Sequence, residues 1–164
     1  MTWLRTAVFA ALGTFAAGAA AAQNADTIRR GEYLARIMDC GGCHTPGALA
    51  GQPDQARALA GSSIGFEVPN LGYIFPPNLT PDADTGLGRW TAAQMTAAIR
   101  TGHRPDGRIL VPVMPWPSYA ALTDADAEAL VAYLRGLAPI RNQVPAMTGA
   151  GARPGGPYLT VAQP

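Results

Sequence analysis

The chain has 164 residues, of which 14% are charged, and its 12 basic and 11 acidic side chains give a formal net charge of +1. All of the basic side chains are arginine, and the chain has two cysteines. A chain so close to neutrality has no overall charge that attracts nucleic acid or an acidic partner, so nucleic-acid binding is not expected.

The first predicted element is an export leader over residues 1–22. Residues 1–5 end in a positive charge, residues 6–22 are apolar and small, and the three alanines at 20–22 suit signal peptidase. A retained membrane anchor is the alternative, but the stretch is alanine-rich and marginal in length for a bilayer span. We expect cleavage before Gln23, delivery to the periplasm, and a mature chain without a membrane span.

A first helix is predicted from about Asp26 to Asp39. Asp26 can cap its start. Apolar residues recur along it at helical spacing: Ile28, Leu34, Ile37 and Met38.

The helix leads into Cys40-Gly-Gly-Cys43-His44, which has the attachment pattern of c-type haem. Two thiols at this spacing on a short helical turn can each form a thioether with one vinyl group of the porphyrin. The histidine then lies beneath the iron as proximal ligand, with its other ring nitrogen donating to a backbone carbonyl. We therefore expect one covalently bound haem c on Cys40 and Cys43, with His44 on the iron.

Three other uses of the cysteine pair must be weighed. A redox pair normally follows a strand, whereas this pair follows a predicted helix. Zinc requires two further ligands, and His103 is the only other histidine. A disulfide across two intervening residues closes too small a loop to stabilise the fold much. The complete five-residue pattern favours haem.

Two more helices are predicted. The second begins with a capping box formed by Thr91 and Gln94 and ends near Gly102. The third begins at Thr123 and is stopped by Pro139. Its apolar residues recur at helical spacing: Ala127, Leu130, Tyr133, Leu134 and Leu137.

Long stretches rich in proline and glycine separate these helices, at about 45–88 and 103–118. Irregular segments of this length need an organising centre, and a haem disc can be one. The segment 146–164 is also rich in proline and glycine and is predicted to be an extended or disordered tail. The expected organisation is the leader, one monohaem domain over 23–145, and this tail.

Met114 is the favoured sixth ligand of the iron. Proline on both sides stiffens its loop and can hold the thioether in place. Core packing is the commoner use of methionine. Among the competitors, Met38 belongs to the helical stripe, Met95 faces Trp90 as a staple partner, and Met147 lies in the predicted tail. His/Met ligation is also the common arrangement in cytochromes c.

The remaining candidate residues are weaker. His103 lies in a polar run that is typical of a surface turn, so it is not expected on the iron. Side chains that could contact the haem, as donors to its propionates or by packing on the methionine side, are Arg89, Trp90, Arg104, Arg108 and Trp116.

The chain resembles class I cytochromes c, and more narrowly the haem domains in cytochrome subunits of bacterial periplasmic alcohol, gluconate and aldehyde dehydrogenases. The resemblance covers roughly residues 26–145. It is carried, besides the haem motif, by Gly31-x-Tyr33-Leu34, Pro77-Asn78-Leu79-Thr80-Pro81-Asp82, Thr85-Gly86-Leu87-Gly88-Arg89-Trp90, Pro112-Val113-Met114-Pro115 and Ala132-Tyr133-Leu134-Arg135.

The resemblance implies an all-α class I cytochrome c fold, with helices and long loops wrapped around one covalent haem. It implies that the first and last helices cross near Gly31, and that His44 and Met114 are the axial ligands. Subunits of that kind usually carry three haem domains and a membrane-binding C-terminal helix. With one haem motif and a proline-broken tail, this chain is expected to be a soluble monohaem carrier.

The implied function is electron transfer rather than catalysis. A periplasmic dehydrogenase is the expected donor, and an oxidase or another cytochrome the expected acceptor. Two alternatives predict other properties. A haem enzyme or gas sensor has an open distal position, and a non-haem dithiol protein is colourless.

Overall fold

The N-terminal helix covers residues 24–37 of the described chain, which runs from residue 24 to residue 162 in this computed structural model. The predicted leader lies outside the described residues. The helix ends two residues before the predicted end because Asp39 has a φ of 53°, in the left-handed region. This turn redirects the chain into α2 (Cys40–His44), a single short helix that contains the whole haem motif.

Helix α3 (Ala92–Thr101) confirms the second predicted helix. The Thr91 hydroxyl accepts from the Gln94 amide at 3.2 Å, and the Gln94 side chain accepts from the Thr91 amide at 2.9 Å, as the predicted capping box requires. Gly102 ends the helix with a φ of 73°, which glycine adopts at little cost.

Helix α5 (Asp124–Gly136) confirms the third predicted helix, and the Thr123 hydroxyl accepts from the Asp126 amide at its start. The N-terminal helix crosses α5 at Gly31, as expected. A Cβ at Gly31 would collide with the carbonyl of Ala129, so the two backbones touch directly at this point. The absence of a side chain therefore sets the distance between these helices.

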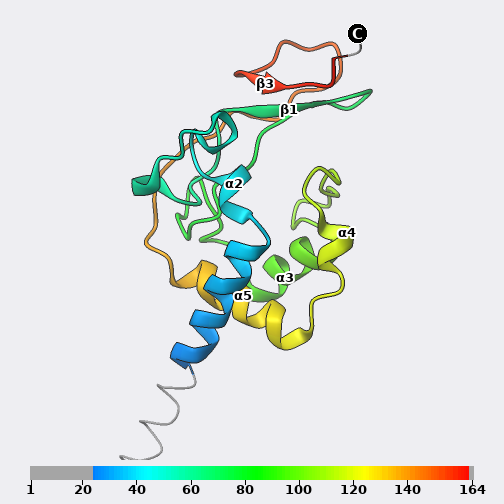
Figure 1. Cartoon of the computed structure of the whole chain (residues 1–164). Helices are drawn as coiled ribbons and strands as arrows, with labels where there is room; N and C mark the ends of the chain where they lie inside the picture. Colours follow the sequence, from blue (N-terminus) through cyan, green and yellow to red (C-terminus); the bar gives the residue numbers. More distant parts are fainter. Residues whose placement is uncertain (1–23, 163–164) are drawn as a thin grey trace, which may run out of the picture.

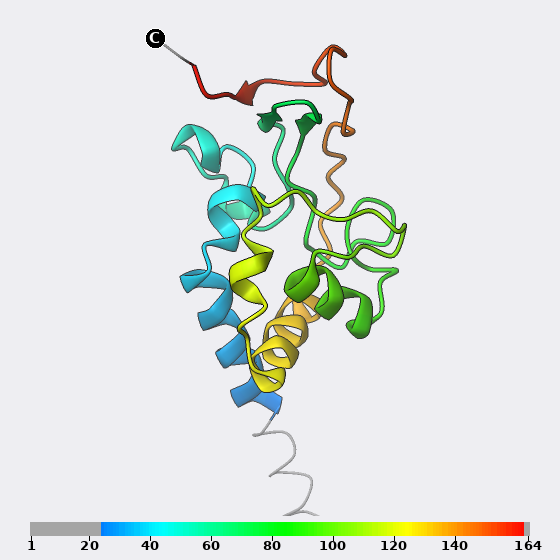
Figure 2. The same cartoon turned by 90° about the vertical axis from the view of Figure 1, so that its right-hand side faces the viewer.

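The hydrophobic core lies where the N-terminal helix, α3 and α5 meet, below the strands in Figures 1 and 2. Its buried members come from all three helices and from the first long loop: Leu34, Ala35, Leu59, Met95, Ile99, Ala129, Leu130, Val131 and Leu134.

A three-stranded sheet corrects the all-α expectation. Strand β1 (Gly65–Val68) pairs antiparallel with β2 (Gly72–Ile74) and parallel with β3 (Tyr158–Leu159), in the order β2-β1-β3. The strands lie at the end of the molecule away from the start of the N-terminal helix (Figure 1). They are too short to show an alternating pattern, and the β1–β3 pairing joins distant segments, so local sequence could not reveal them.

The segment expected to be a tail beyond residue 145 is extended and hydrogen-bonded to the rest of the domain. Thr148 and Tyr73 exchange two backbone hydrogen bonds of 2.9 and 3.0 Å, and the Gly65 amide donates to Pro157. The Tyr73 and Tyr158 rings lie 4.7 Å apart. The expected domain boundary at residue 145 therefore falls inside a structured segment.

Short helical turns interrupt the long loops, namely η1 (Ala48–Ala50), η2 (Gln55–Arg57) and α4 (Trp116–Tyr119). Between residues 24 and 162, no helix is long and apolar enough to cross a membrane.

Candidate functional site

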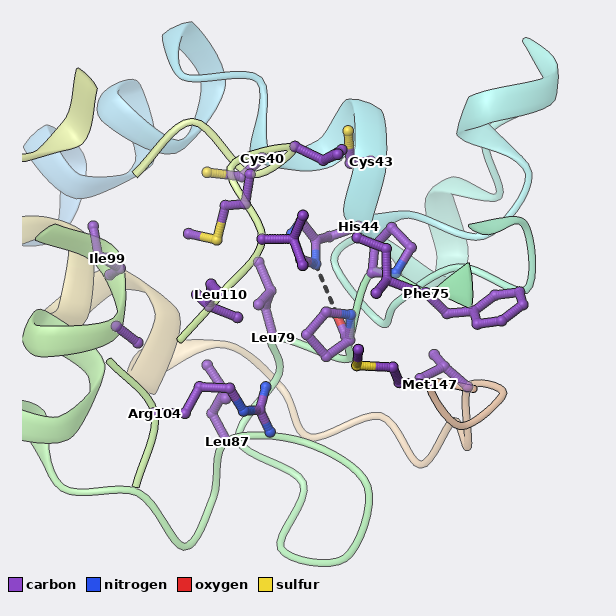
Figure 3. A pocket seen from close by; sticks show the side chains of 18 of the residues that line it. Cys40, Cys43, His44, Phe75, Leu79, Leu87, Ile99, Arg104, Leu110 and Met147 are labelled. Atoms are coloured by element: carbon purple, nitrogen blue, oxygen red, sulfur yellow. Dashed lines mark hydrogen bonds between the residues drawn. The ribbon is translucent and has the colours of Figure 1, made fainter. Parts of the chain in front are cut away.

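A cavity of about 610 Å³ lies between α2, both long loops, the sheet and the C-terminal segment (Figure 3). Its walls are mainly apolar, and its size is that of a site for a small molecule or cofactor. Cys40, Cys43, His44 and Met114 all line it. The fold therefore brings the four residues expected to hold haem iron and porphyrin to one cavity, although Met114 is distant from the others in sequence.

His44 is held as a neutral imidazole with one nitrogen committed. Its side chain is buried, and its Nδ1 lies 2.8 Å from the carbonyl oxygen of Pro77, to which it donates. Burial lowers the pKa of His44, which disfavours the imidazolium form. Nε2 is then the unprotonated nitrogen available to a metal, and Pro77 is the backbone acceptor that a proximal ligand needs.

The two cysteines are free and lie three positions apart on α2, which is little more than one helical turn long. Burial raises the pKa of Cys40 to about 11 and also raises that of Cys43. Reactive dithiols have a lowered pKa, so this environment does not favour the redox-pair interpretation. A zinc site is not favoured either, because the described residues contain no group of three or more His, Cys, Asp or Glu side chains placed to hold a metal ion.

The side chain of Asp39 lies against Gly42. A Cβ at position 42 would lie within 3 Å of the Asp39 carboxylate, the flexible end of a side chain whose own backbone is left-handed. The haem motif and the residue before it therefore fit together as one compact turn.

A buried polar network holds the loop that carries Pro77. Asn78 is fully buried, and its Nδ2 donates to the Ile140 carbonyl at 2.7 Å and to the Thr85 hydroxyl at 3.1 Å. Its Oδ1 accepts from the amide and the hydroxyl of Thr80. Satisfied buried networks of this kind are rigid, so the Pro77 carbonyl is fixed where His44 needs it.

Met114 lies on a turn that is closed on both sides. Its amide donates to Val111 at 3.1 Å, and its carbonyl accepts from the Trp116 amide at 2.7 Å. Trp116, a candidate haem contact, is not among the residues that line the cavity. Its Nε1 instead donates to the Leu110 carbonyl at 2.9 Å, and its ring packs against Gly102. Trp116 therefore shapes the methionine loop from outside.

Tyr119, at the end of α4, lines the cavity and ties the methionine side to the haem motif. Its hydroxyl donates to the Met38 carbonyl at 2.9 Å, just before α2. Burial raises the pKa of Tyr119 to about 12, so the hydroxyl remains a donor at neutral pH.

The other methionines considered as ligands also reach the cavity. Met38 and Met95 line it, and Met95 is a core residue that is 2% exposed. Met147, assigned from sequence to the tail, lines the cavity as well and is labelled in Figure 3. No pattern in the proline- and glycine-rich C-terminal sequence indicated this position.

Two of the three arginines predicted near the haem line the cavity. Arg104 and Arg108 do so, and both pair with Asp106, at 3.3 and 2.7 Å respectively. Asp106 was not among the residues predicted for the site. Its position between Arg104 and Arg108 in a tight turn could have indicated that it pairs with them. The trio provides two guanidinium groups beside an apolar cavity, which suits carboxylates of a bound group.

Of the neighbouring candidates Arg89 and Trp90, only Trp90 lies at the cavity. Trp90 lines the cavity, with the Arg104 guanidinium 5.2 Å from its ring centroid. Arg89 is not among the lining residues and pairs with Asp84 at 2.9 Å on the surface. His103, interpreted as a surface residue, is exposed and also lies outside the cavity lining.

The Asp106 carboxylate is expected to give the protein part of its acid sensitivity. Hydrogen bonding to Arg108 lowers the pKa of Asp106 to about 2, below the value of about 3.9 usual for an unfolded chain. Its stabilising effect is therefore complete above about pH 4 and is lost as the pH falls towards 2. Between about pH 4 and pH 2, the melting temperature should decline less steeply in Asp106→Asn than in wild type. Glu128→Gln removes one surface charge and serves as the control. Its melting temperature should decline as steeply as that of wild type.

The donor set fits haem c. Free thiols and a neutral histidine lie on one short helix, a thioether lies in the same cavity, and the walls are apolar with arginines beside them. Residues 28–138 match the family model of cytochrome c. This match agrees with the chemistry of the cavity. The chain belongs to the cytochrome c family, whose members bind haem c covalently and transfer electrons.

Three relatives are cytochrome subunits of dehydrogenases. The alcohol dehydrogenase (quinone) cytochrome c subunit of Gluconobacter oxydans is 44% identical over 82% of this chain and 27% of its own length. The gluconate 2-dehydrogenase cytochrome c subunit of Pantoea cypripedii is 42% identical over 79% and 28%. The fructose dehydrogenase cytochrome subunit of Gluconobacter japonicus is 39% identical over 66% and 21%. The chain thus matches about a quarter of each relative.

Proposed function

We propose that this protein is a c-type cytochrome with one haem, attached through Cys40 and Cys43, with His44 and Met114 as axial ligands. The observation that supports this most directly is the shared cavity, in which the hydrogen bond from His44 to Pro77 leaves Nε2 free for iron. The bound haem supplies a reversible one-electron change at its iron.

The residues of the chain define what that iron can do. Pro77 orients the His44 ring, and the stiff loop presents the Met114 thioether, which favours ferrous iron and raises the reduction potential. Apolar walls exclude water, and Arg104 and Arg108 can donate to the haem carboxylates. With both axial positions filled, no substrate binds iron, so the protein carries electrons and is not an enzyme.

We further propose that the protein works in the periplasm, exported by the leader at residues 1–22, with a dehydrogenase as electron donor. The relatives named as cytochrome subunits of alcohol, gluconate and fructose dehydrogenases support the choice of donor. An oxidase or a second cytochrome is the proposed acceptor. N-terminal sequencing of protein from a periplasmic fraction should begin at Gln23, and recovery of the intact leader would contradict the proposed cleavage.

Carbon monoxide binding tests the proposed ligation. An alkaline pyridine spectrum should first show one covalent haem per chain, because a colourless product would exclude the proposal. The ferrous protein should then change little on exposure to carbon monoxide, because the Met114 sulfur occupies the distal position. A full carbon monoxide spectrum would instead show an open iron, as in a haem enzyme or gas sensor.

A further inference from the structure

The C-terminal segment forms part of the cavity wall. Five consecutive residues, 143–147, line the cavity, and the segment on either side is hydrogen-bonded to the rest of the domain. We call residues 143–147 the strap. Helix α5 ends at residue 136, so the strap is a later crossing of the chain over the site.

The first end of the strap is anchored to the wall that carries His44. The Asn142 side chain donates to the Ala60 carbonyl at 2.7 Å, and its amide donates to the Thr85 hydroxyl at 3.0 Å. The next residue after Ala60, Gly61, donates from its amide to the His44 carbonyl at 2.7 Å. Two hydrogen bonds, from Asn142 to Ala60 and from Gly61 to His44, therefore connect the start of the strap to the histidine.

The second end reaches the loop that carries Met114. Thr148 pairs with Tyr73 of β2, which positions Met147, and the Arg108 Nη1 lies 3.8 Å from the Met147 sulfur, a distance suited to a weak hydrogen bond. Arg108 is fixed within the methionine loop, because its carbonyl accepts from the Arg104 amide and its side chain pairs with Asp106.

We propose that the strap holds the two walls of the haem cavity together, and that Met147 is the positioning residue through which it restrains the loop carrying Met114. This rests on the proposed His44 and Met114 ligation. The strap crosses from the histidine wall to the methionine loop, and the Met147 sulfur contacts the Arg108 side chain of that loop. Without this contact, the loop opens more readily and the Met114 thioether leaves the iron more often.

The test measures how easily an external ligand displaces Met114 in the holoprotein. Imidazole is titrated into the ferric wild type, Met147→Ser, Met147→Leu and Val161→Ser. Met147 is 41% exposed, so its replacement leaves the core intact, and Val161, 90% exposed beyond the strap, is the matched control. Loss of one ordinary side-chain contact should tighten imidazole binding in Met147→Ser by about fivefold.

Met147→Leu keeps the apolar bulk but removes the sulfur that accepts from Arg108, so it should tighten imidazole binding nearly as much as Met147→Ser. Val161→Ser should match wild type. Unchanged imidazole affinity in Met147→Ser would overturn the proposal. So would equal tightening in Val161→Ser, because the effect would then belong to the tail in general.

Hydrogen exchange provides a readout that does not depend on the iron ligand. In Met147→Ser the amides of Arg104 and Leu110, bonded to Arg108 and Gly102, should exchange faster, while those of α3 should not change. If wild type itself binds carbon monoxide fully, the proposed ligation fails, and exchange alone then decides on the strap. Unchanged exchange in these two amides would overturn the strap.

Discussion

Replacement of Met114 with alanine is expected to leave the haem attached but to remove the sulfur ligand from its iron. In the proposed site the thioethers depend on Cys40 and Cys43, and the proximal bond on His44, so none of these should be lost. Because methionine sulfur stabilises ferrous iron, the reduction potential should fall by a substantial part of the roughly 0.8 V range that axial ligands span. Visible spectroscopy should show loss of the methionine-to-iron charge-transfer band, and a spectroelectrochemical titration gives the potential.

Ser118→Ala is the matched control for this experiment. Ser118 lies four residues further along the same segment, is exposed and is not among the cavity-lining residues. This variant should keep the band and the potential of wild type. A Met114→Ala protein with an unchanged band would show that another group holds the sixth position, and Met147 would then be the first methionine to replace.

Replacement of Gly31 with alanine is expected to destabilise the protein, although alanine is the better helix former. Propensity alone predicts a gain of roughly 1 kcal/mol for this change. At Gly31, however, the added Cβ would collide with the Ala129 carbonyl on α5, and a backbone group cannot rotate away. The helices must separate, so the free energy of unfolding should fall by about 1–3 kcal/mol, as in other overpacked cores.

Denaturant unfolding of the holoprotein measures this effect, with Gly136→Ala as the control. Gly136 ends α5, and a Cβ there would have nothing within 4 Å. This variant should be as stable as wild type or slightly more stable. If Gly31→Ala were also as stable as wild type, the close contact between the N-terminal helix and α5 would be contradicted.

Local sequence patterns predicted the helices well because their signals lie within a few residues of one another. The Thr91–Gln94 capping box and the Thr123 cap are both present in the structure. The end of the first helix was predicted two residues too far, because a spacing pattern does not register the left-handed backbone at Asp39.

Long-range pairing explains what the sequence did not reveal of the fold. The sheet depends on β3 meeting β1, and the strap depends on Asn142 reaching Ala60, 82 positions away. A proline- and glycine-rich segment such as 146–162 has no periodicity of its own. Its path is extended, one of the two states predicted for it, but which partners it meets could not be read from the sequence. The cavity wall and the strand that it forms were therefore not predicted.

By itself, the sequence determined the haem motif and the helix that leads into it. Cys40, Cys43 and His44 lie within five residues, and their spacing alone indicates haem attachment. It also nominated Met114, through the flanking prolines and the family resemblance. Only the tertiary structure decided that Pro77 accepts from His44, that Arg108 and not Arg89 reaches the cavity, and that Met147 lines it. These contacts join distant segments, and their geometry exists only once the chain has folded around the site.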